Sequence, residues 1–320
     1  MSPPSTRTLL GVAWSARGPL IRLRDDDAAE SQVVPADTVR LNYRIDGVAV
    51  RRCVGHKPFR SGHGDYVDCR RDPEPGKRVC ERCAIVEATF AANLHHAHTR
   101  GSAELDPSIR EHLKQPNRLY LAAFRDGTIK VGTSTATRSH ARLAEQGAWM
   151  ARFMAETTNG VAVRQLEDAV TEVWSVPQAV SARRKVKGMV DPLADTELDQ
   201  RLAEAAADVA RLMENSPDER IEPLAPETDT GRGEPGTGPG ERWRHPLADH
   251  PATENVLAYP PNLLDGAHDL QVVTAIGRVL LVRRPHADDV FAIDPAPLFG
   301  IELDIGDYGS AEIAIQDSLF

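Results

Sequence analysis

The sequence predicts a multidomain α+β protein with β-rich regions at both ends, and three observations support this fold class. Runs typical of strands occupy much of residues 1–50 and 262–320. Four cysteines gather between positions 53 and 83, in a stretch rich in glycine and proline. Between them and the C-terminal region, residues 118–175 follow the order strand, turn, strand, helix, strand, helix.

The N-terminal region, residues 1–50, is expected to be β-rich. Residues 20–24 and 39–45 alternate apolar and polar side chains, as half-buried strands do. Asp46 and Gly47 form a dipeptide typical of tight hairpin turns, and the apolar residues 48–50 follow it. We therefore expect a hairpin that joins 39–45 to 48–50.

Residues 51–100 are expected to form a zinc-binding cysteine cluster and a helix after it. Four thiolates complete the tetrahedral shell of a closed structural zinc site, and Cys-x-x-Cys spacing lets two of them bind from one turn. The four cysteines are Cys53, Cys69, Cys80 and Cys83. Disulfide pairing and redox chemistry remain alternatives. His56 has ligand spacing from Cys53, so it is an alternative to one of the cysteine ligands.

Residues 117–190 are expected to form the central α/β core. Strands are predicted at 119–124, 128–132 and 149–156. Ser134 or Thr135 is suited to cap a helix that runs to Gln146, and Gly147 is suited to end it. Apolar residues at helical spacing predict a second helix over 161–174.

The remaining sequence divides into three parts. Residues 191–215 are predicted to hold a surface helix, because they are rich in alanine and leucine. Residues 216–261 are acidic and rich in proline and glycine, which predicts a disordered linker. Residues 262–320 predict a C-terminal β segment with strands at 270–274, 279–284, 290–293 and 301–305, which we expect to pack back on the N-terminal region.

Charge is distributed unevenly along the chain. The net charge is −9, but residues 118–190 contain 11 Lys and Arg against 6 Asp and Glu, whereas residues 191–260 contain 6 against 16. The densest basic patch consists of Arg183, Arg184, Lys185 and Lys187. A basic middle segment suits a phosphate backbone, and a solvated surface is the alternative interpretation of the charge. We expect a nucleic-acid partner and favour DNA over RNA, although charge does not distinguish the two. There is no apolar run of membrane-spanning length and no signal-peptide pattern, so we expect a cytoplasmic protein without a membrane partner.

The central core resembles the GIY-YIG nucleases. Arg118-Leu119-Tyr120 lies where that superfamily carries Gly-Ile-Tyr, and Lys130-Val131-Gly132 lies where it carries Tyr-Ile-Gly. An arginine on the next helix and a glutamate on a later helix complete the superfamily pattern. The candidates here are Arg138, Arg142 and Glu167. The resemblance implies a three-stranded antiparallel sheet flanked by helices.

The roles that this resemblance implies fit the chemistry of phosphodiester hydrolysis. Glu167 would hold one Mg²⁺ or Mn²⁺, and Arg138 or Arg142 would bind the phosphate. Tyr120 would position or deprotonate the attacking water. Lys130 replaces the second tyrosine of the signature, and it can bind phosphate or, if desolvated, act as a base. Arg118 replaces the first glycine.

Most of the chain apart from the linker also resembles domain-of-unknown-function family 2797, an uncharacterised bacterial and archaeal group. The residues that carry this resemblance are 130–133, 142–148 and 266–294. The resemblance of the core to the GIY-YIG nucleases leads us to expect a metal-dependent endonuclease. One alternative is a catalytically inactive nucleic-acid-binding module, and another is a zinc-stapled adapter that binds a protein partner.

Overall fold

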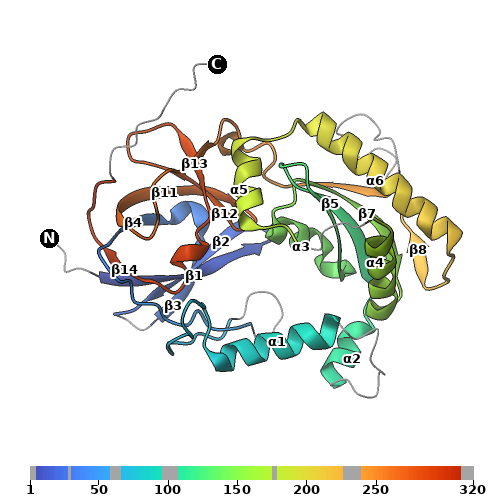
Figure 1. Ribbon diagram of the computed structural model, residues 1–320, viewed down its shortest axis with the longest axis horizontal. Coiled ribbons are helices and arrows are strands. Elements are labelled where there is room, and N and C mark those ends of the chain that lie inside the picture. Colours follow the sequence, from blue (N-terminus) through green and yellow to red (C-terminus); the bar gives the residue numbers. More distant parts are fainter. Residues whose placement is uncertain are drawn as a thin grey trace. The chain divides into compact units, whose positions relative to one another are not determined.

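The computed structural model describes residues 5–27, 30–57, 66–95, 107–174, 179–225 and 239–310. The chain divides into two compact units (Figure 1). One unit combines Met1–Glu87 with Pro251–Phe320, and the other consists of Ala88–His250. The first unit is therefore built from both ends of the sequence, and the second from the middle.

The first unit contains a nine-stranded sheet in the order β10-β13-β12-β11-β4-β14-β1-β2-β3. Its N-terminal strands are β1 Ser5–Ser15, β2 Gly18–Asp25, β3 Glu30–Pro35 and β4 Arg40–Ile45. Its C-terminal strands are β10 Leu257–Ala258, β11 Gly266–Ile276, β12 Val279–Arg283, β13 Val290–Ile293 and β14 Glu302–Ile305. The short 3-10 helices of this unit are η1 Ala36–Thr38, η4 Pro251–Thr253 and η5 Ala296–Leu298.

Strand β4 links the two halves of this sheet. It pairs antiparallel with β11 on one side and with β14 on the other, so an N-terminal strand lies between two C-terminal strands (Figure 1). Its apolar residues Leu41, Tyr43 and Ile45 are buried in the core of this unit. The expectation that the C-terminal segment packs back on the N-terminal region is confirmed by these pairings.

The predicted hairpin over residues 39–50 is wrong. Residues 48–50 form no strand, and Val48 is 99% exposed. The reason is competition for β4. Both of its edges are already occupied by strands that lie far along the sequence, so the Asp46-Gly47 turn has no free edge to return to.

The second unit contains a five-stranded antiparallel sheet. Its strands are β5 Asn117–Ala123, β6 Ile129–Thr135, β7 Met150–Thr157, β8 Ile221–Pro223 and β9 Glu241–Arg244. The order is β6-β5-β7-β8, and β9 also pairs with β7. The three longer strands lie where the sequence predicts them, and β8 and β9 extend the sheet beyond the expected three strands.

The described residues contain six α-helices, which together with the two sheets make a mixed α+β fold. They are α1 Glu81–His95, α2 Pro107–Leu113, α3 Ser139–Gln146, α4 Gly160–Trp174, α5 Ala182–Val190 and α6 Asp195–Asn215. A 3-10 turn, η3 Ala136–Arg138, precedes α3, and Gly147 ends α3 in the left-handed conformation with φ 72°. No helix among the described residues is long and apolar enough to cross a bilayer.

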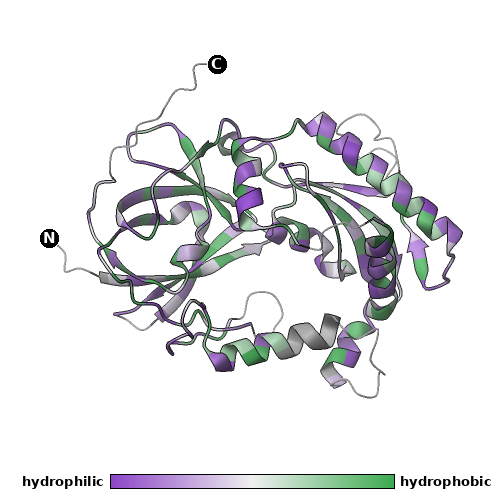
Figure 2. Ribbon diagram, viewed as in Figure 1, coloured by the Kyte–Doolittle hydropathy of each residue, from purple (hydrophilic) through white to green (hydrophobic). Residues whose placement is uncertain are grey.

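Helix α6 mixes hydrophilic and hydrophobic residues along its whole length (Figure 2). It packs against β5 and β7, and its apolar face buries Leu198, Leu202, Val209 and Met213. The helix predicted over 191–215 is thus present, with one face in the core and only the opposite face at the surface.

The prediction of a disordered linker over residues 216–261 is wrong for the part that the structure describes. Strand β8 pairs with β7 through Ile221 and Glu222, and β9 pairs with β7 through residues 241–244. Short strands such as these have little sequence signal of their own, because they are held in the extended conformation by pairing with β7. Residues 226–238 lie outside the described part of the chain.

Candidate functional site

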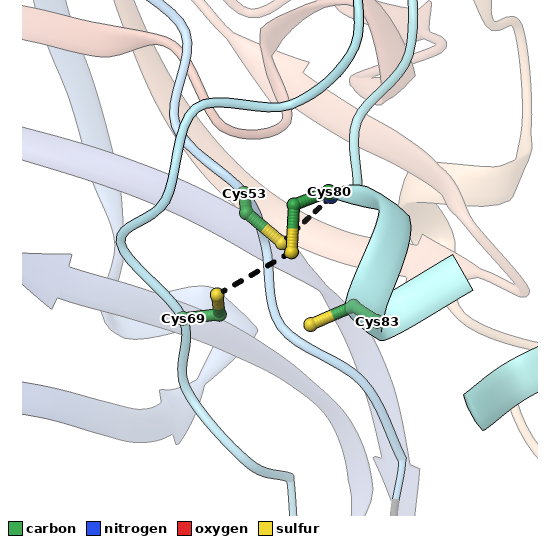
Figure 3. Close-up of side chains that lie close together, drawn as sticks. All are labelled: Cys53, Cys69, Cys80 and Cys83. Atoms are coloured by element: carbon green, nitrogen blue, oxygen red, sulfur yellow. Dashed lines mark hydrogen bonds between the residues drawn. The ribbon is translucent and has the colours of Figure 1, made fainter. Parts of the chain in front are cut away.

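The four cysteines converge in the first unit. Their sulfur atoms lie within 4.8 Å of one another, and Cys53, Cys80 and Cys83 are buried (Figure 3). Four sulfurs arranged tetrahedrally at a Zn–S length of about 2.3 Å would be about 3.8 Å apart. The distance between the sulfurs of Cys69 and Cys80 is 3.8 Å. The four-cysteine group could therefore bind a metal such as zinc.

All four cysteines are free thiols, so the structure contains no disulfide among them. The backbone N–H groups of Gly55 and Cys80 donate to Cys53 Sγ over 3.4 Å and 3.2 Å. His56 is not one of the four clustered residues. Its Nδ1 lies 3.2 Å from Cys83 Sγ, within hydrogen-bonding distance of that sulfur. Hydrogen bonds of this kind orient metal ligands and stabilise their charge.

A buried arginine fixes the loop that carries Cys69. Arg24 on β2 is 0% exposed, and its Nη1 donates to Asp68 Oδ1 over 3.1 Å and to the Cys69 carbonyl over 3.4 Å. The Asp68 carboxylate in turn accepts from the Cys69 N–H over 2.8 Å. The position of Cys69 is therefore set by the sheet of the first unit.

The second candidate site lies on one face of β5 and β6. In the antiparallel register, Tyr120 is opposite Gly132, and Ala122 is opposite Lys130. Cross-strand partners point to the same face, and so do residues two apart on a strand, so Tyr120 and Lys130 share a face. A Cβ atom added to Gly132 would lie 2.6 Å from the Tyr120 hydroxyl oxygen. The phenol therefore lies directly across the glycine.

Helix α3 meets the Tyr120 hydroxyl group. Gln146 Nε2 donates to Tyr120 Oη over 2.7 Å, and Arg142 also hydrogen-bonds to the phenol. Arg138 is directed elsewhere: its Nη2 binds Glu145 Oε1 at 2.8 Å. Of the two arginines that the sequence proposes, Arg142 reaches Tyr120.

Glu167 enters from α4. It is 5% exposed, and its Oε2 accepts from Arg164 Nη1 over 2.5 Å. Its negative charge acts on both Tyr120 and Lys130. Arg142 and Glu167 thus both act on Tyr120 and on Lys130, which share one face of the sheet.

Burial changes the two central pKa values in opposite directions. It raises the pKa of Tyr120, although the positive charge of Arg142 and the hydrogen bond from Gln146 partly oppose this effect. Burial, helped by the positive charges of Arg142 and Lys185, lowers the pKa of Lys130 to about 8. At neutral pH the phenol therefore remains a hydrogen-bond donor, whereas part of the lysine population is a neutral amine.

The predicted basic patch forms helix α5, and part of it faces the same site. Lys185 acts on Lys130, and its Nζ lies 5.3 Å from the centre of the Phe124 ring. Arg184 Nη1 donates to Thr128 Oγ1 over 3.1 Å at the start of β6. Arg183 and Lys187 are exposed. The patch therefore extends the positive charge of the site to the protein surface.

Two further observations concern neighbouring residues. Arg118 binds Glu156 at 2.9 Å and Glu241 at 3.1 Å, so two carboxylates neutralise it. Gln146 is a site residue that the sequence hypotheses did not include. The signal that could have identified it is its spacing, since it lies one helical turn after Arg142 and immediately before the terminating Gly147.

Comparison with known proteins gives a match to a protein-family model. The family model described as protein of unknown function DUF2797 matches residues 45–231, which is more than half of the chain. No curated protein matches the sequence, and no solved structure matches the fold. The matched residues include both the cysteine cluster and the face that carries Tyr120 and Lys130, and the chain accordingly belongs to the DUF2797 family.

Proposed function

We propose that this protein is a metal-dependent endonuclease that hydrolyses phosphodiester bonds in nucleic acid, DNA more readily than RNA. The observation that carries the proposal is the meeting of Tyr120, Lys130, Arg142 and Glu167 around one face of β5 and β6. The resemblance of this segment to a GIY-YIG core supports the same reaction.

In this proposal each residue has one role. The buried phenol of Tyr120 donates a hydrogen bond to a non-bridging phosphate oxygen, and the Arg142 guanidinium neutralises charge on the same group. The neutral amine of Lys130 takes the proton of the attacking water, because burial makes that amine available near neutral pH. Glu167 would hold Mg²⁺ or Mn²⁺, which would supply Lewis acidity at the phosphate.

The four-cysteine group has a structural role in this proposal. Zinc suits four thiolates with no open position, so it would stabilise the loop rather than take part in hydrolysis. The basic residues of α5 would bind the phosphate backbone beyond the cleavage point.

The test is nicking of supercoiled plasmid by purified protein with Mg²⁺ or Mn²⁺, repeated with single-stranded DNA and with RNA. Glu167→Gln should abolish nicking without changing the unfolding temperature. Glu172→Gln, on the exposed side of the same helix, is the matched control and should cleave like the wild type. Equal nicking by the wild type and Glu167→Gln would rule out the proposed reaction.

A second candidate is a nucleic-acid-binding module without turnover. The observation that favours it is the close ion pair of Glu167 with Arg164, which competes with a metal for the carboxylate. Binding that weakens steeply with salt, together with no cleavage in either metal, would support this candidate over the first.

A further inference from the structure

Gln146 has one end of its amide hydrogen-bonded and the other end without a partner among the described residues. Its Nε2 donates to the Tyr120 hydroxyl over 2.7 Å. Its Oε1 is buried, and no described residue donates to it. A buried acceptor without a donor costs about 1–3 kcal/mol, so such atoms usually mark a water or functional site.

The position of this oxygen is fixed by the end of helix α3 and by the hydrogen bond from the same amide to Tyr120. Gln146 is the last residue of α3, and Gly147 ends the helix in the left-handed conformation. Both ends of one planar amide are close together, so any group bound to Oε1 lies beside the Tyr120 hydroxyl. Arg142, one turn earlier on α3, reaches the same hydroxyl.

The chemistry of Oε1 selects its ligand. An ionised phosphodiester offers only acceptor oxygens, which an amide oxygen does not attract, whereas a water molecule brings two donors. The phosphate itself is better held by the positive groups nearby, namely Arg142 and Lys185. The acceptor oxygen of Gln146 thus suits the attacking water, and the cations suit the phosphate.

We propose that Gln146 positions the attacking water of the hydrolysis, an inference that rests on the proposed function. The amide oxygen accepts one water proton and aims the water oxygen at phosphorus. As the new P–O bond forms, the other water proton passes to the Lys130 amine. The bond from phosphorus to the leaving oxygen breaks, and that oxygen takes a proton from solvent. An amide that orients a hydrolytic water has a precedent in GTP hydrolysis.

The experiment compares steady-state cleavage of a DNA substrate by the wild type, Gln146→Met and Gln146→Asn. Methionine keeps the volume without the amide, and asparagine keeps the amide but retracts it by one methylene. Both should lower kcat about 10²-fold with little change in KM, because the water is misplaced while phosphate binding persists. Gln200→Met, on the exposed face of α6, is the matched control and should keep both constants.

A second readout does not require cleavage. The pKa of Tyr120, followed by NMR of ¹³C-labelled tyrosine and assigned with Tyr120→Phe, should rise in Gln146→Met, because the hydrogen bond from Gln146 lowers it. If the wild type cleaves and folded Gln146→Asn cleaves equally fast, the water-positioning role is overturned and the nuclease proposal stands. If the wild type does not cleave, both are overturned, whatever the tyrosine titration shows.

Discussion

Lys130 and Tyr120 show how burial, as the largest influence on both pKa values, assigns different chemistry to two side chains on one face. Both are polar, and they are 8% and 1% exposed. Burial disfavours the charged form of each, so the lysine loses its proton more readily and the tyrosine holds its proton more firmly. In the proposed reaction, Lys130 is therefore the proton acceptor and Tyr120 is a hydrogen-bond donor.

The first prediction concerns the pH dependence of cleavage. Because Lys130 must be neutral to accept a proton, kcat/KM should rise with pH through a pKa near 8 and level off above it. Lys130→Arg should abolish cleavage at every pH, since a guanidinium stays charged. Lys187→Arg on α5 is the control. A profile that is flat between about pH 6 and pH 9 would contradict the role of Lys130.

The second prediction concerns the cost of keeping Lys130 buried. Its pKa is about 8 in the folded protein and about 10.4 in an unfolded chain, so the unfolded chain binds more protons between these values. Stability of the wild type should therefore rise with pH across this window. Lys130→Met should raise the free energy of unfolding at pH 7 by about 1–3 kcal/mol, with a gain that disappears above about pH 10. Urea denaturation at several pH values measures both effects, and a less stable Lys130→Met would contradict them.

The third prediction concerns the glycine beneath Tyr120. Gly132→Ala places a methyl group 2.6 Å from the present position of the hydroxyl oxygen, so the phenol must move. We expect a loss of about 1–3 kcal/mol in the free energy of unfolding and a larger relative loss of cleavage. Gly309→Ala, where no atom lies within 4 Å of the added Cβ, should change neither. Unaltered cleavage by Gly132→Ala would show that the position of the phenol does not matter.

At the scale of elements, local patterns predict structure well where a strand pairs with, or a helix is ended by, residues close by in the sequence. Strands β5 and β6 are joined by only five residues, 124–128, and α3 ends at a glycine, so their positions follow from nearby sequence. The Asp46-Gly47 turn has an equally good local signal, but it fails because β4 is paired on both edges by distant strands. Helix α5 was not predicted, because its basic run has no apolar stripe long enough to reveal it.

The candidate site follows the same rule. Helices α3 and α4 could be predicted from sequence, and Tyr120, Lys130 and Glu167 could be proposed as candidates from it. The choice of Arg142 over Arg138 could not be made from the sequence. Both arginines are close to Glu145, and only the interaction of Arg142 with Tyr120 separates them. The contact of Gln146 with Tyr120 could not be predicted from the sequence either, since a glutamine at a helix end is normally exposed to solvent.

The fourth prediction concerns the cysteine loop as an element. Metal analysis of reduced protein should give about one zinc per chain, as four thiolates form one site. Chelation should remove hydrogen-exchange protection from residues 51–57 and 66–83, while β5 and β6 keep theirs. The loop has few apolar residues, so the bound metal would provide the stability that a hydrophobic core provides elsewhere. Added zinc should restore protection. Protection that is indifferent to chelation, or a zinc content near zero, would contradict the structural role.

At the scale of the whole molecule, sequence order and spatial order differ. The first unit encloses the second in the sequence, since it is formed by residues from both ends. Its core joins Leu9, Ile21 and Tyr43 to Leu280, Phe291 and Leu303. Pairing between strands so far apart in the sequence produces no local sequence pattern. Both terminal regions could therefore be predicted as β, but the order of their strands in one shared sheet could not.

The fifth prediction follows from this arrangement. A chain truncated after His250 loses β10–β14, and β4 then has no partner on either edge. We expect residues 5–45 to lose hydrogen-exchange protection, whereas β5, β6 and β7 keep theirs, because their pairing partners all lie within the second unit. Truncation after residue 310 is the control. Full protection of β1–β4 in the shorter chain would show that the N-terminal strands fold without their C-terminal partners.

The most direct test of the central claim is a crystal structure of the protein with Ca²⁺ and a short single-stranded DNA, in which Ca²⁺ replaces Mg²⁺ to slow hydrolysis. The account predicts one phosphate in hydrogen-bonding reach of Tyr120 Oη and Arg142, with the Lys130 amine beside it and the cation on Glu167. A phosphate bound only at the exposed residues of α5, with Tyr120 and Lys130 still shielded from it, would contradict the account.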